Sequence, residues 1–409
     1  MDQPVIAQDV PAAIRRAHHE AAAHRGPAVV VVPMDDWAAE MHEGLGLAAP
    51  TAVLRAGSDA ARAADQIAGL LDAATAPVLV VGSGADDQRT WDALVALTER
   101  LGAPVWQEAF GARAGFPQDH PAFAGHLPAG RERLRAVLAP HDLALVVGTG
   151  AFRQYRYEPG PLAPDGLQVV VVSDDADDLH HSAADLAVLA DPATLCEAVT
   201  ARVSLREAGR GGSHTPEALE PPGEGESLRA AHVFTALAQR LPRDVVVVEE
   251  TPSTRPDLHR LLPTRAPRGF VSAAMGGLGF GLPAAIGLRM GDPTRPVVAL
   301  LGDGSTIYGV QGLWSAARYH VGVLFIVLAN GRYAIMDRLA DEQGGKAPWP
   351  AFEDVDVQAL SRALGCPSRR VSTYGELIDA LDEVLPTLAD RREPLLLDVT
   401  VLIETEFAP

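Results

Sequence analysis

The sequence predicts the α/β fold class, with two doubly wound parallel-sheet domains and a remnant of a third. Apolar runs of strand length recur along the chain, helix-like stretches join them, and the runs are apolar throughout instead of alternating with polar residues. A strand that helices cover on both faces is apolar in this way. Strands that alternate with helices are typical of parallel sheets.

The strand-like runs fall into two sets, one in each half of the chain. The first set is AVVVVP (28–33), PVLVVGSGAD (77–86), LALVVGTGAF (143–152) and LQVVVVSDDADD (167–178). The second set is DVVVVEETPST (244–254), PVVALLGDGS (296–305), VLFIVLANG (323–331) and PLLLDVTV (394–401). Because helix-like stretches join the runs, we expect crossover helices between parallel strands.

A stretch rich in Gly, Pro and charge, EAGRGGSHTPEALEPPGEGES (207–227), has the composition of a linker. It separates a predicted middle domain, 44–206, from a predicted C-terminal domain, 228–409. Residues 1–43 hold one predicted helix, Val10–His24, and one strand, which is too little apolar surface for a core. We interpret them as the end of a further domain.

The chain is acidic, with 34 Lys and Arg residues against 53 Asp and Glu residues, a net charge of −19 over 409 residues. No basic patch stands out, so nucleic acid and anionic membranes are not expected as partners. Cys196 and Cys366 lie far apart in the sequence, so we expect two free thiols in a reducing compartment. The sequence shows no signal peptide, and its apolar runs are much shorter than the roughly 20 residues of a membrane helix. We therefore expect a cytoplasmic protein.

Glycines end two strand-like runs of the middle domain, at Gly82-Ser83-Gly84 and Gly148-Thr149-Gly150. A dinucleotide site would need the three-glycine fingerprint, which neither stretch completes. Tight strand-to-helix turns therefore explain these glycines better than a bound nucleotide.

The stretch LLGDGSTIYGV (300–310) places Asp303 between two glycines at the end of an apolar run, and Asn330 ends the next run. A simple Gly-Asp-Gly turn is the alternative explanation. However, ligands of open parallel sheets bind beyond the carboxyl ends of the strands, where both side chains would converge. Their oxygens suit Mg²⁺, and the flanking glycines, Ser305 and a helix start suit an anion. The pattern predicts a metal-bridged diphosphate site.

Several motifs around these residues resemble a known family. GGLGFGLPAAIGL, GDGSTIYGVQGLWSAARYHV and ANGRYAIM resemble the cofactor-binding half of thiamine-diphosphate-dependent decarboxylases, especially those of the benzoylformate decarboxylase type. The upstream stretches GPAVVVVPMDDW, FAGHLPAG and FRQYRYEPG are similar to the same family in order and spacing. The resemblance covers nearly the whole chain. It implies thiamine diphosphate and Mg²⁺ as cofactors and a small-molecule 2-oxo acid as substrate.

The resemblance also implies roles for individual residues. The metal would be held by Asp303, Asn330 and the main-chain carbonyl of Arg332. The residues around the cofactor would be Ser253, Thr254, Gly276, Gly277, Leu278, Gly302, Gly304, Ser305, Tyr308 and Tyr333. Leu278 would be catalytic as well, because it would wedge beneath the cofactor and bend it, so that the cofactor can deprotonate itself. The alternative for Leu278 is an ordinary core position.

The sequence departs from the family around the substrate. Tyr155 stands where the family's decarboxylase has a catalytic histidine. A phenol would not relay protons near neutral pH, so Tyr155 is a candidate catalytic residue that would hydrogen-bond a carboxylate or an intermediate, and a packing role is the alternative. Ser272 and Leu339 replace aromatic residues, and Ile335 replaces a much smaller one. We therefore expect reduced activity on benzoylformate and a preference for smaller or differently shaped 2-oxo acids.

In this family an N-terminal pyrimidine-binding domain supplies a glutamate to the cofactor and side chains to the substrate pocket. Residues 1–43 resemble only the last helix and strand of that domain, and the rest would be ~100–150 residues, one typical domain. We expect this chain alone to be a feeble catalyst, with that domain elsewhere in the same protein or on a separate chain. The resemblance also implies a homo-dimer or tetramer.

Three functions stay open at this point. The first is a carboxy-lyase for the non-oxidative decarboxylation of a 2-oxo acid. The second is a carboligase of the acetolactate synthase type, which product analysis would distinguish. The third is a non-catalytic paralogue that binds the cofactor. Asp303 and Asn330 weigh against the third, because unused metal ligands would be free to change.

Overall fold

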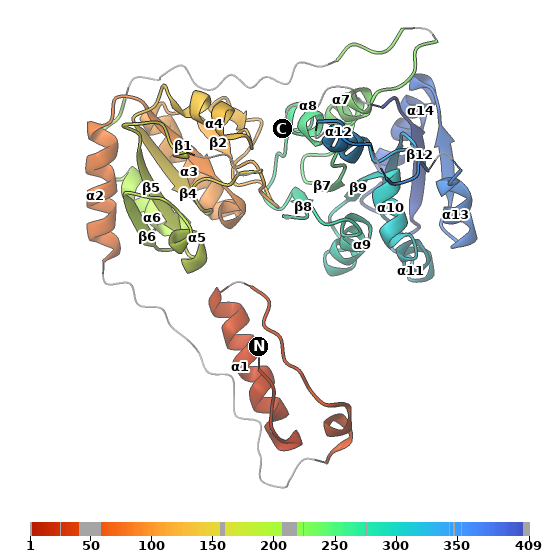
Figure 1. Ribbon diagram of the computed structural model, residues 1–409, viewed down its shortest axis with the longest axis horizontal. Coiled ribbons are helices and arrows are strands. Elements are labelled where there is room, and N and C mark those ends of the chain that lie inside the picture. Colours follow the sequence, from red (N-terminus) through yellow and green to blue (C-terminus); the bar gives the residue numbers. More distant parts are fainter. Residues whose placement is uncertain are drawn as a thin grey trace.

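The computed structural model describes residues 2–24, 26–40, 59–155, 160–206, 219–223, 225–274, 276–342, 344–346, 348–352 and 354–403. Within these ranges the chain forms two six-stranded sheets, and the strand pairs in both are parallel. Figure 1 shows each sheet between helices. The predicted α/β class with two parallel sheets is confirmed. Most of the predicted linker, residues 207–218 and 224, lies outside the described residues.

The first sheet has the strand order β3-β2-β1-β4-β5-β6. Its strands are β1 (Pro77–Val81), β2 (Val105–Gln107), β3 (Phe123–His126), β4 (Leu143–Val147), β5 (Gln168–Ser173) and β6 (Leu186–Leu189). Its helices are α2 (Ala60–Ala73), α3 (Gln88–Leu101), α4 (Arg131–Leu138), α5 (Ala176–His180) and α6 (Pro192–Thr200). Successive strand residues face opposite layers: Leu79 packs with α2, α3 and α6, whereas Val78 and Val80 pack with α4.

The second sheet has the strand order β11-β12-β10-β9-β7-β8. Its strands are β7 (Val246–Glu250), β8 (Phe270–Ser272), β9 (Val297–Gly302), β10 (Leu324–Ala329), β11 (Ser368–Val371) and β12 (Leu395–Thr400). The accompanying helices are α7 (Ala230–Arg240), α8 (Arg255–Leu261), α9 (Gly281–Gly291), α10 (Asp303–Gly309), α11 (Gly312–Arg318), α12 (Ala334–Glu342), α13 (Val357–Ala363) and α14 (Tyr374–Val384). The chain passes from β7 to β8 on one side and then to β9 on the other, so the strand order reverses between β7 and β9.

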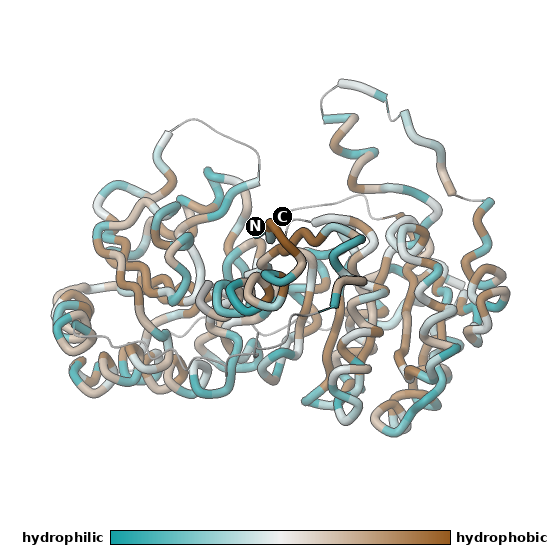
Figure 2. Tube along the Cα trace, turned by 90° about the horizontal axis from the view of Figure 1, so that it is seen from below, coloured by the Kyte–Doolittle hydropathy of each residue, from teal (hydrophilic) through white to brown (hydrophobic). Residues whose placement is uncertain are grey.

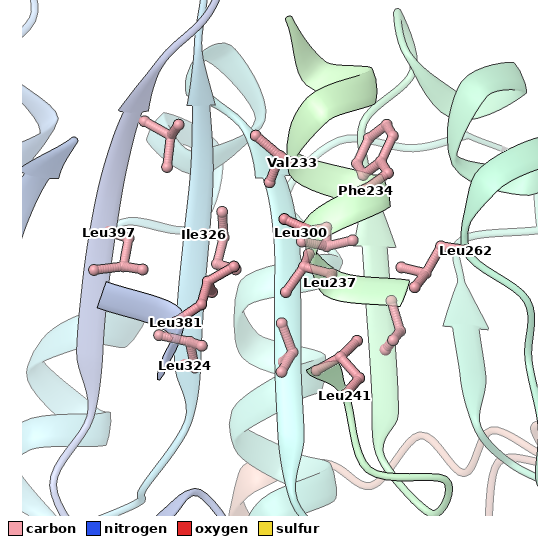
Figure 3. Packing of buried hydrophobic residues seen from close by; sticks show 14 of the residues in the cluster. Val233, Phe234, Leu237, Leu241, Leu262, Leu300, Leu324, Ile326, Leu381 and Leu397 are labelled. Carbon is pink, nitrogen blue, oxygen red and sulfur yellow. The ribbon is translucent and has the colours of Figure 1, made fainter. Parts of the chain in front are cut away.

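The core of the second sheet consists of two apolar layers, one on each face. Figure 3 shows Leu237 of α7 lying over the sheet near Leu300 of β9, and Leu381 of α14 lying near Leu324 and Ile326 of β10. The next strand residue, Leu301, packs in the opposite layer with α9 and α11. Figure 2 shows the hydrophobic residues concentrated in the strands. Burial on both faces is why the strand-like runs are apolar throughout.

Residues 2–40 contain α1 (Val10–His24), which has the predicted bounds. The predicted strand at 28–33 is wrong, because only an isolated parallel bridge between Asp2 and Val30 forms there. Val29 and Val31 remain 53% and 42% exposed, so the apolar residues of this run do not reach a core in the described structure. None of the helices in the described ranges is both long and apolar enough to cross a membrane.

Hydrogen bonds join the loops of the first sheet to those of the second. The N–H of Gln118 donates to the carbonyl of Thr264 at 2.9 Å, and the N–H of Thr264 donates to Oε1 of Gln118 at 2.8 Å. Asp86 Oδ1 accepts a hydrogen bond from the N–H of Arg268 at 2.7 Å. These contacts hold the region around β8 against the first sheet's domain.

Candidate active site

Three loops at one edge of the second sheet carry most of the predicted cofactor residues. β7, β9 and β10 are neighbours, and the register pairs Leu328 with Gly302. The strands therefore deliver Thr251, Asp303 and Asn330 to the same edge. In open α/β sheets this edge, at the point where the strand order reverses, is where ligands bind.

Asp303 links two of these loops. Its Oδ1 accepts a hydrogen bond from the N–H of Gly304 at 2.8 Å, and its Oδ2 accepts one from the N–H of Gly331 at 2.6 Å. In the second loop, Asn330 Oδ1 accepts a hydrogen bond from the N–H of Arg332 at 3.0 Å. The structure thus brings Asp303 and Asn330 together and places Arg332 on the same loop.

The environment of Asp303 fits a bound cation. Burial raises the pKa of the carboxyl group, although the N–H groups of Gly331 and Gly304 act in the opposite direction, and only 7% of Asp303 is exposed. A cation would offset the lost hydration, and carboxylate, amide and main-chain oxygens are ligands that Mg²⁺ takes. Within the described residues, no group of three or more His, Cys, Asp or Glu side chains is placed to bind a metal ion.

The turn after Asp303 is closely packed. A Cβ atom on Gly304 would lie 2.5 Å from Cε1 of Tyr333 and 3.0 Å from the ring of Phe352, so this position requires glycine. Burial, followed by hydrogen bonding with Tyr308, raises the pKa of Tyr333 to about 12. The Tyr333 phenol therefore remains a hydrogen-bond donor at neutral pH. Ser305 is buried in the same turn, whereas Tyr308 is 58% exposed.

The loop before α9 borders open space. Gly276 has a φ of +67°, in the left-handed region that favours glycine, and no atom lies within 4 Å of a Cβ placed on Gly276 or Gly277. Leu278 is 36% exposed, so it is not the ordinary core residue considered as the alternative. An exposed apolar side chain beside open space is available to contact a ligand.

Glu250 holds this loop in place, a role that the sequence did not predict. Its Oε1 accepts a hydrogen bond from the N–H of Gly279 at 2.6 Å, and its Oε2 accepts one from the N–H of Gly281. Burial raises the pKa of Glu250, with these N–H groups acting in the opposite direction. The available signal was a charged residue, within EETPST, at the end of an otherwise apolar strand.

The loop between β7 and α8 carries Ser253 and Thr254. Ser253 Oγ accepts a hydrogen bond from the N–H of Ile335 at 3.0 Å, which joins this loop to α12. Ile335 and Leu339 are both half-buried on that helix. Thr254 is buried, and its Oγ1 has no hydrogen-bond partner among the described residues. A phosphate oxygen would satisfy this hydroxyl, so the loop fits a diphosphate.

The residues predicted for substrate contact come from both sheets' domains. The N–H of Ser272 donates to the carbonyl of Ala112, in the loop between β2 and β3, at 2.9 Å. Phe110, from the same loop, has its ring centroid 6.2 Å from that of Tyr155. Tyr155 is 54% exposed. The structure therefore places the loop that contacts Tyr155 against Ser272 at the end of β8.

Two family models match the chain, and both match at the sheets described above. The model of the thiamine pyrophosphate enzyme central domain matches residues 64–199, around the first sheet. The model of the thiamine pyrophosphate enzyme C-terminal TPP binding domain matches residues 253–399, which include Asp303 and Asn330.

Relatives of the chain include curated proteins and solved structures. A benzoylformate decarboxylase of Pseudomonas aeruginosa is 35% identical over 417 residues, covering 97% of this chain and 75% of that protein. The benzoylformate decarboxylase structure from Polynucleobacter necessarius superposes with a TM-score of 0.90 at 31% identity, covering 99% of this chain and 76% of that one. A thiamine diphosphate-dependent 4-hydroxybenzoylformate decarboxylase from Rhodococcus jostii RHA1 gives a TM-score of 0.90 at 32% identity, with the same coverages of 99% and 76%. The chain belongs to the thiamine-pyrophosphate-dependent enzyme family that includes benzoylformate decarboxylase.

Proposed function

We propose that this chain is a carboxy-lyase that decarboxylates a 2-oxo acid without oxidation, using thiamine diphosphate and Mg²⁺. The observation that carries the proposal is the buried Asp303 carboxylate, hydrogen-bonded to the N–H of Gly331 beside Asn330. Family membership supports the proposal, since the relatives named above are decarboxylases of benzoylformate, itself a 2-oxo acid.

In this proposal the metal is held by Asp303, Asn330 and the main-chain carbonyl of Arg332. The diphosphate lies against residues of the three loops: Ser253, Thr254, Gly302, Gly304, Ser305, Tyr308 and Tyr333. The Thr254 hydroxyl, which has no hydrogen-bond partner in the described part of the chain, supports this placement. The rest of the cofactor lies against the loop of Gly276, Gly277 and Leu278, which borders open space.

The chain's own residues bind the cofactor, orient the substrate and exclude water from the site. Thiamine diphosphate, when bound, supplies the electron sink that decarboxylation of a 2-oxo acid requires. Leu278 would hold the cofactor bent, and Glu250 fixes the loop that carries Leu278 through the N–H groups of Gly279 and Gly281. Tyr155 hydrogen-bonds the substrate carboxylate from the first sheet's domain. The branched side chain of Ile335 narrows the pocket against a phenyl ring.

We further propose that a pyrimidine-binding domain, in the same polypeptide or on a second chain, completes the site in a homo-dimer or tetramer. Residues 1–43 are the end of that domain, 44–206 the middle domain, 207–227 the linker and 228–409 the cofactor domain. The chain spans 75% of the length of the Pseudomonas aeruginosa relative, which supports a further domain. Free, buried thiols at both cysteines fit a cytoplasmic location.

The test is a panel of 2-oxo acids incubated with the cofactor-loaded enzyme, together with the pyrimidine-binding domain where that is a separate chain. Carbon dioxide release with an aldehyde as the product supports the proposal. A hydroxy ketone as the main product would indicate a carboligase instead. No carbon dioxide from any 2-oxo acid contradicts the proposal, and benzoylformate as the best substrate contradicts the narrowed pocket.

A further inference from the structure

A guanidinium group lies beside Ser272, where the family has an aromatic side chain. Arg255, the first residue of α8, has its Nη2 3.1 Å from Ser272 Oγ and 2.9 Å from Glu249 Oε2. The Ser272 hydroxyl donates to the same Glu249 oxygen at 2.9 Å. The register of the sheet pairs Glu249 with Ser272, so the three side chains form one polar cluster at the carboxyl ends of β7 and β8.

This cluster borders the proposed substrate pocket. Ser253, two residues before Arg255, accepts a hydrogen bond from the N–H of Ile335 at 3.0 Å. The pocket residues Ile335 and Ser272 therefore contact the segment Ser253–Arg255 at its two ends. The Arg255 side chain is 20% exposed, so a ligand in the pocket can reach part of this side chain.

Both carboxylate oxygens of Glu249 already accept hydrogen bonds, whereas only one nitrogen of the Arg255 guanidinium is engaged within the described ranges. Glu249 Oε1 accepts hydrogen bonds from the N–H and the hydroxyl of Thr251, at 2.5 Å and 2.9 Å, and Oε2 binds Ser272 and Arg255. A guanidinium has five N–H donors. The contacts of Arg255 in the described structure engage Nη2, and Nε is buried without a hydrogen-bond partner there.

The charges near Arg255 leave room for an anion. His259, one turn further along α8, stays neutral, because burial and then the charge of Arg255 lower its pKa to about 3. Its ring stacks on that of His126, with centroids 3.8 Å apart. An acidic group entering from the pocket would meet the terminal nitrogen Nη1, a charged donor that suits carboxylates.

We propose that Arg255 is a specificity-determining residue that binds a second acidic group of the substrate, so that the preferred substrates are 2-oxo acids with a terminal carboxylate. This inference rests on the proposed function and names its substrate class. Glu249 and Ser272 orient the guanidinium through Nη2, and the other terminal nitrogen, Nη1, donates to the second carboxylate. Ile335 favours the slender carbon chain of such an acid over a phenyl ring.

Binding of two matched acids to the cofactor-loaded chain tests the inference without requiring turnover. 2-Oxoglutarate and 2-oxopentanoate have the same carbon chain, and only the first has a terminal carboxylate. We expect 2-oxoglutarate to bind at least about tenfold more tightly in a calorimetric titration. Equal affinities, tighter binding of 2-oxopentanoate, or no binding of either acid to a chain that holds its cofactor would overturn the inference.

Variants of the pair locate the effect. Arg255→Met removes the donors but leaves Glu249 buried without its cation, so the double variant Glu249→Gln/Arg255→Met, which removes both charges, is the one expected to fold. The preference for 2-oxoglutarate should fall to about onefold in the double variant. Arg260→Met is the matched control, because Arg260 is on the same helix and its side chain is 45% exposed; it should keep the preference.

The outcomes separate this inference from the proposed function. A chain that fails to bind thiamine diphosphate contradicts the proposed function. A chain that binds the cofactor and retains its 2-oxoglutarate preference in the folded double variant contradicts only the role of Arg255. In the complete enzyme, the ratio of kcat/KM for the two acids provides the same comparison and does not depend on the fraction of active protein.

Discussion

The N–H of Gly331 donates a hydrogen bond to Oδ2 of Asp303 at 2.6 Å, and this bond ties the loop after β10 to the end of β9. The second Asp303 oxygen binds the N–H of Gly304. One carboxylate therefore organises both of the loops that carry the proposed metal ligands. The strand register that pairs Leu328 with Gly302 makes this contact possible.

Leu278→Ala tests whether the exposed leucine contacts the cofactor. Because Leu278 is 36% exposed, its truncation should shift the Tm by no more than about 2 °C. Turnover should fall by about tenfold or more, since a ligand that is no longer held bent is misplaced for reaction. Thermal melts and kcat at saturating cofactor measure the two effects.

Leu360→Ala, at a side chain 37% exposed on α13, is the matched control and should change neither quantity. A large loss of Tm in Leu278→Ala with unchanged kcat would instead make Leu278 a structural residue.

Glu250→Gln should loosen the loop before α9. An amide offers one acceptor oxygen, so its NH₂ group would face one of the two backbone N–H donors of Gly279 and Gly281. We expect the free energy of unfolding to fall by about 1–3 kcal/mol and cofactor affinity to fall with it. Urea unfolding and calorimetry measure these changes. Glu383→Gln, whose side chain is 62% exposed, is the control; equal behaviour of the two variants would refute the role of Glu250.

Ile335→Ala should widen the substrate pocket. Crowding of a phenyl ring by a branched side chain typically costs ~1–3 kcal/mol. Because the substitution relieves this crowding, we expect kcat/KM for benzoylformate to rise about tenfold relative to that for 2-oxopentanoate. Met336→Ala, at the neighbouring side chain that is 42% exposed, should leave this ratio unchanged. A ratio that does not move in Ile335→Ala would show that Ile335 does not line the pocket.

The buried carboxyl group of Asp86 should make the free energy of unfolding depend on pH. Its side chain is 1% exposed between the two domains. Burial raises the pKa of Asp86 to about 6, although the N–H of Arg268 and the charges of Arg113, Arg268 and Arg295 act in the opposite direction. The folded state therefore retains a proton that the unfolded chain loses near pH ~4. The free energy of unfolding should fall as the pH rises from about 4 to about 6.

Asp86→Asn should remove this decline, because the amide carbonyl can still accept the hydrogen bond from the N–H of Arg268. Above pH ~6 the variant should be more stable than the wild type by on the order of 1–3 kcal/mol. Urea unfolding at about pH 4 and about pH 7 measures the difference. Asp382→Asn, at a side chain 59% exposed, serves as the control; parallel pH profiles for Asp86→Asn and the wild type would contradict the prediction.

The sequence predicted the strands that are buried on both faces and missed shorter ones. Burial leaves a continuous apolar run, as in β9, whose residues are all buried up to Gly302. The edge strand β11 reads SRRV and is mostly half-buried or exposed, so it gives no such signal. The run at 28–33 has the composition of a strand but no sheet to pair with in the described residues.

In the candidate site, Asp303 and Asn330 were predictable because each directly follows a strand. Glu250 and Arg255 were not, because their roles depend on partners that are distant in sequence. Gly279 lies 29 residues from Glu250, and Ser272 lies 17 residues from Arg255. Only the folded chain shows that Glu250 meets the N–H of Gly279 and that Arg255 meets Ser272.

The most direct measurement is a calorimetric titration of the chain with thiamine diphosphate in the presence of Mg²⁺, with Asp303→Ala as the matched variant. We predict saturable binding by the wild type that weakens by about tenfold or more when Mg²⁺ is removed or Asp303 is replaced. Full affinity in Asp303→Ala, or no binding by the wild type, would contradict the assignment of this sheet edge as the cofactor site.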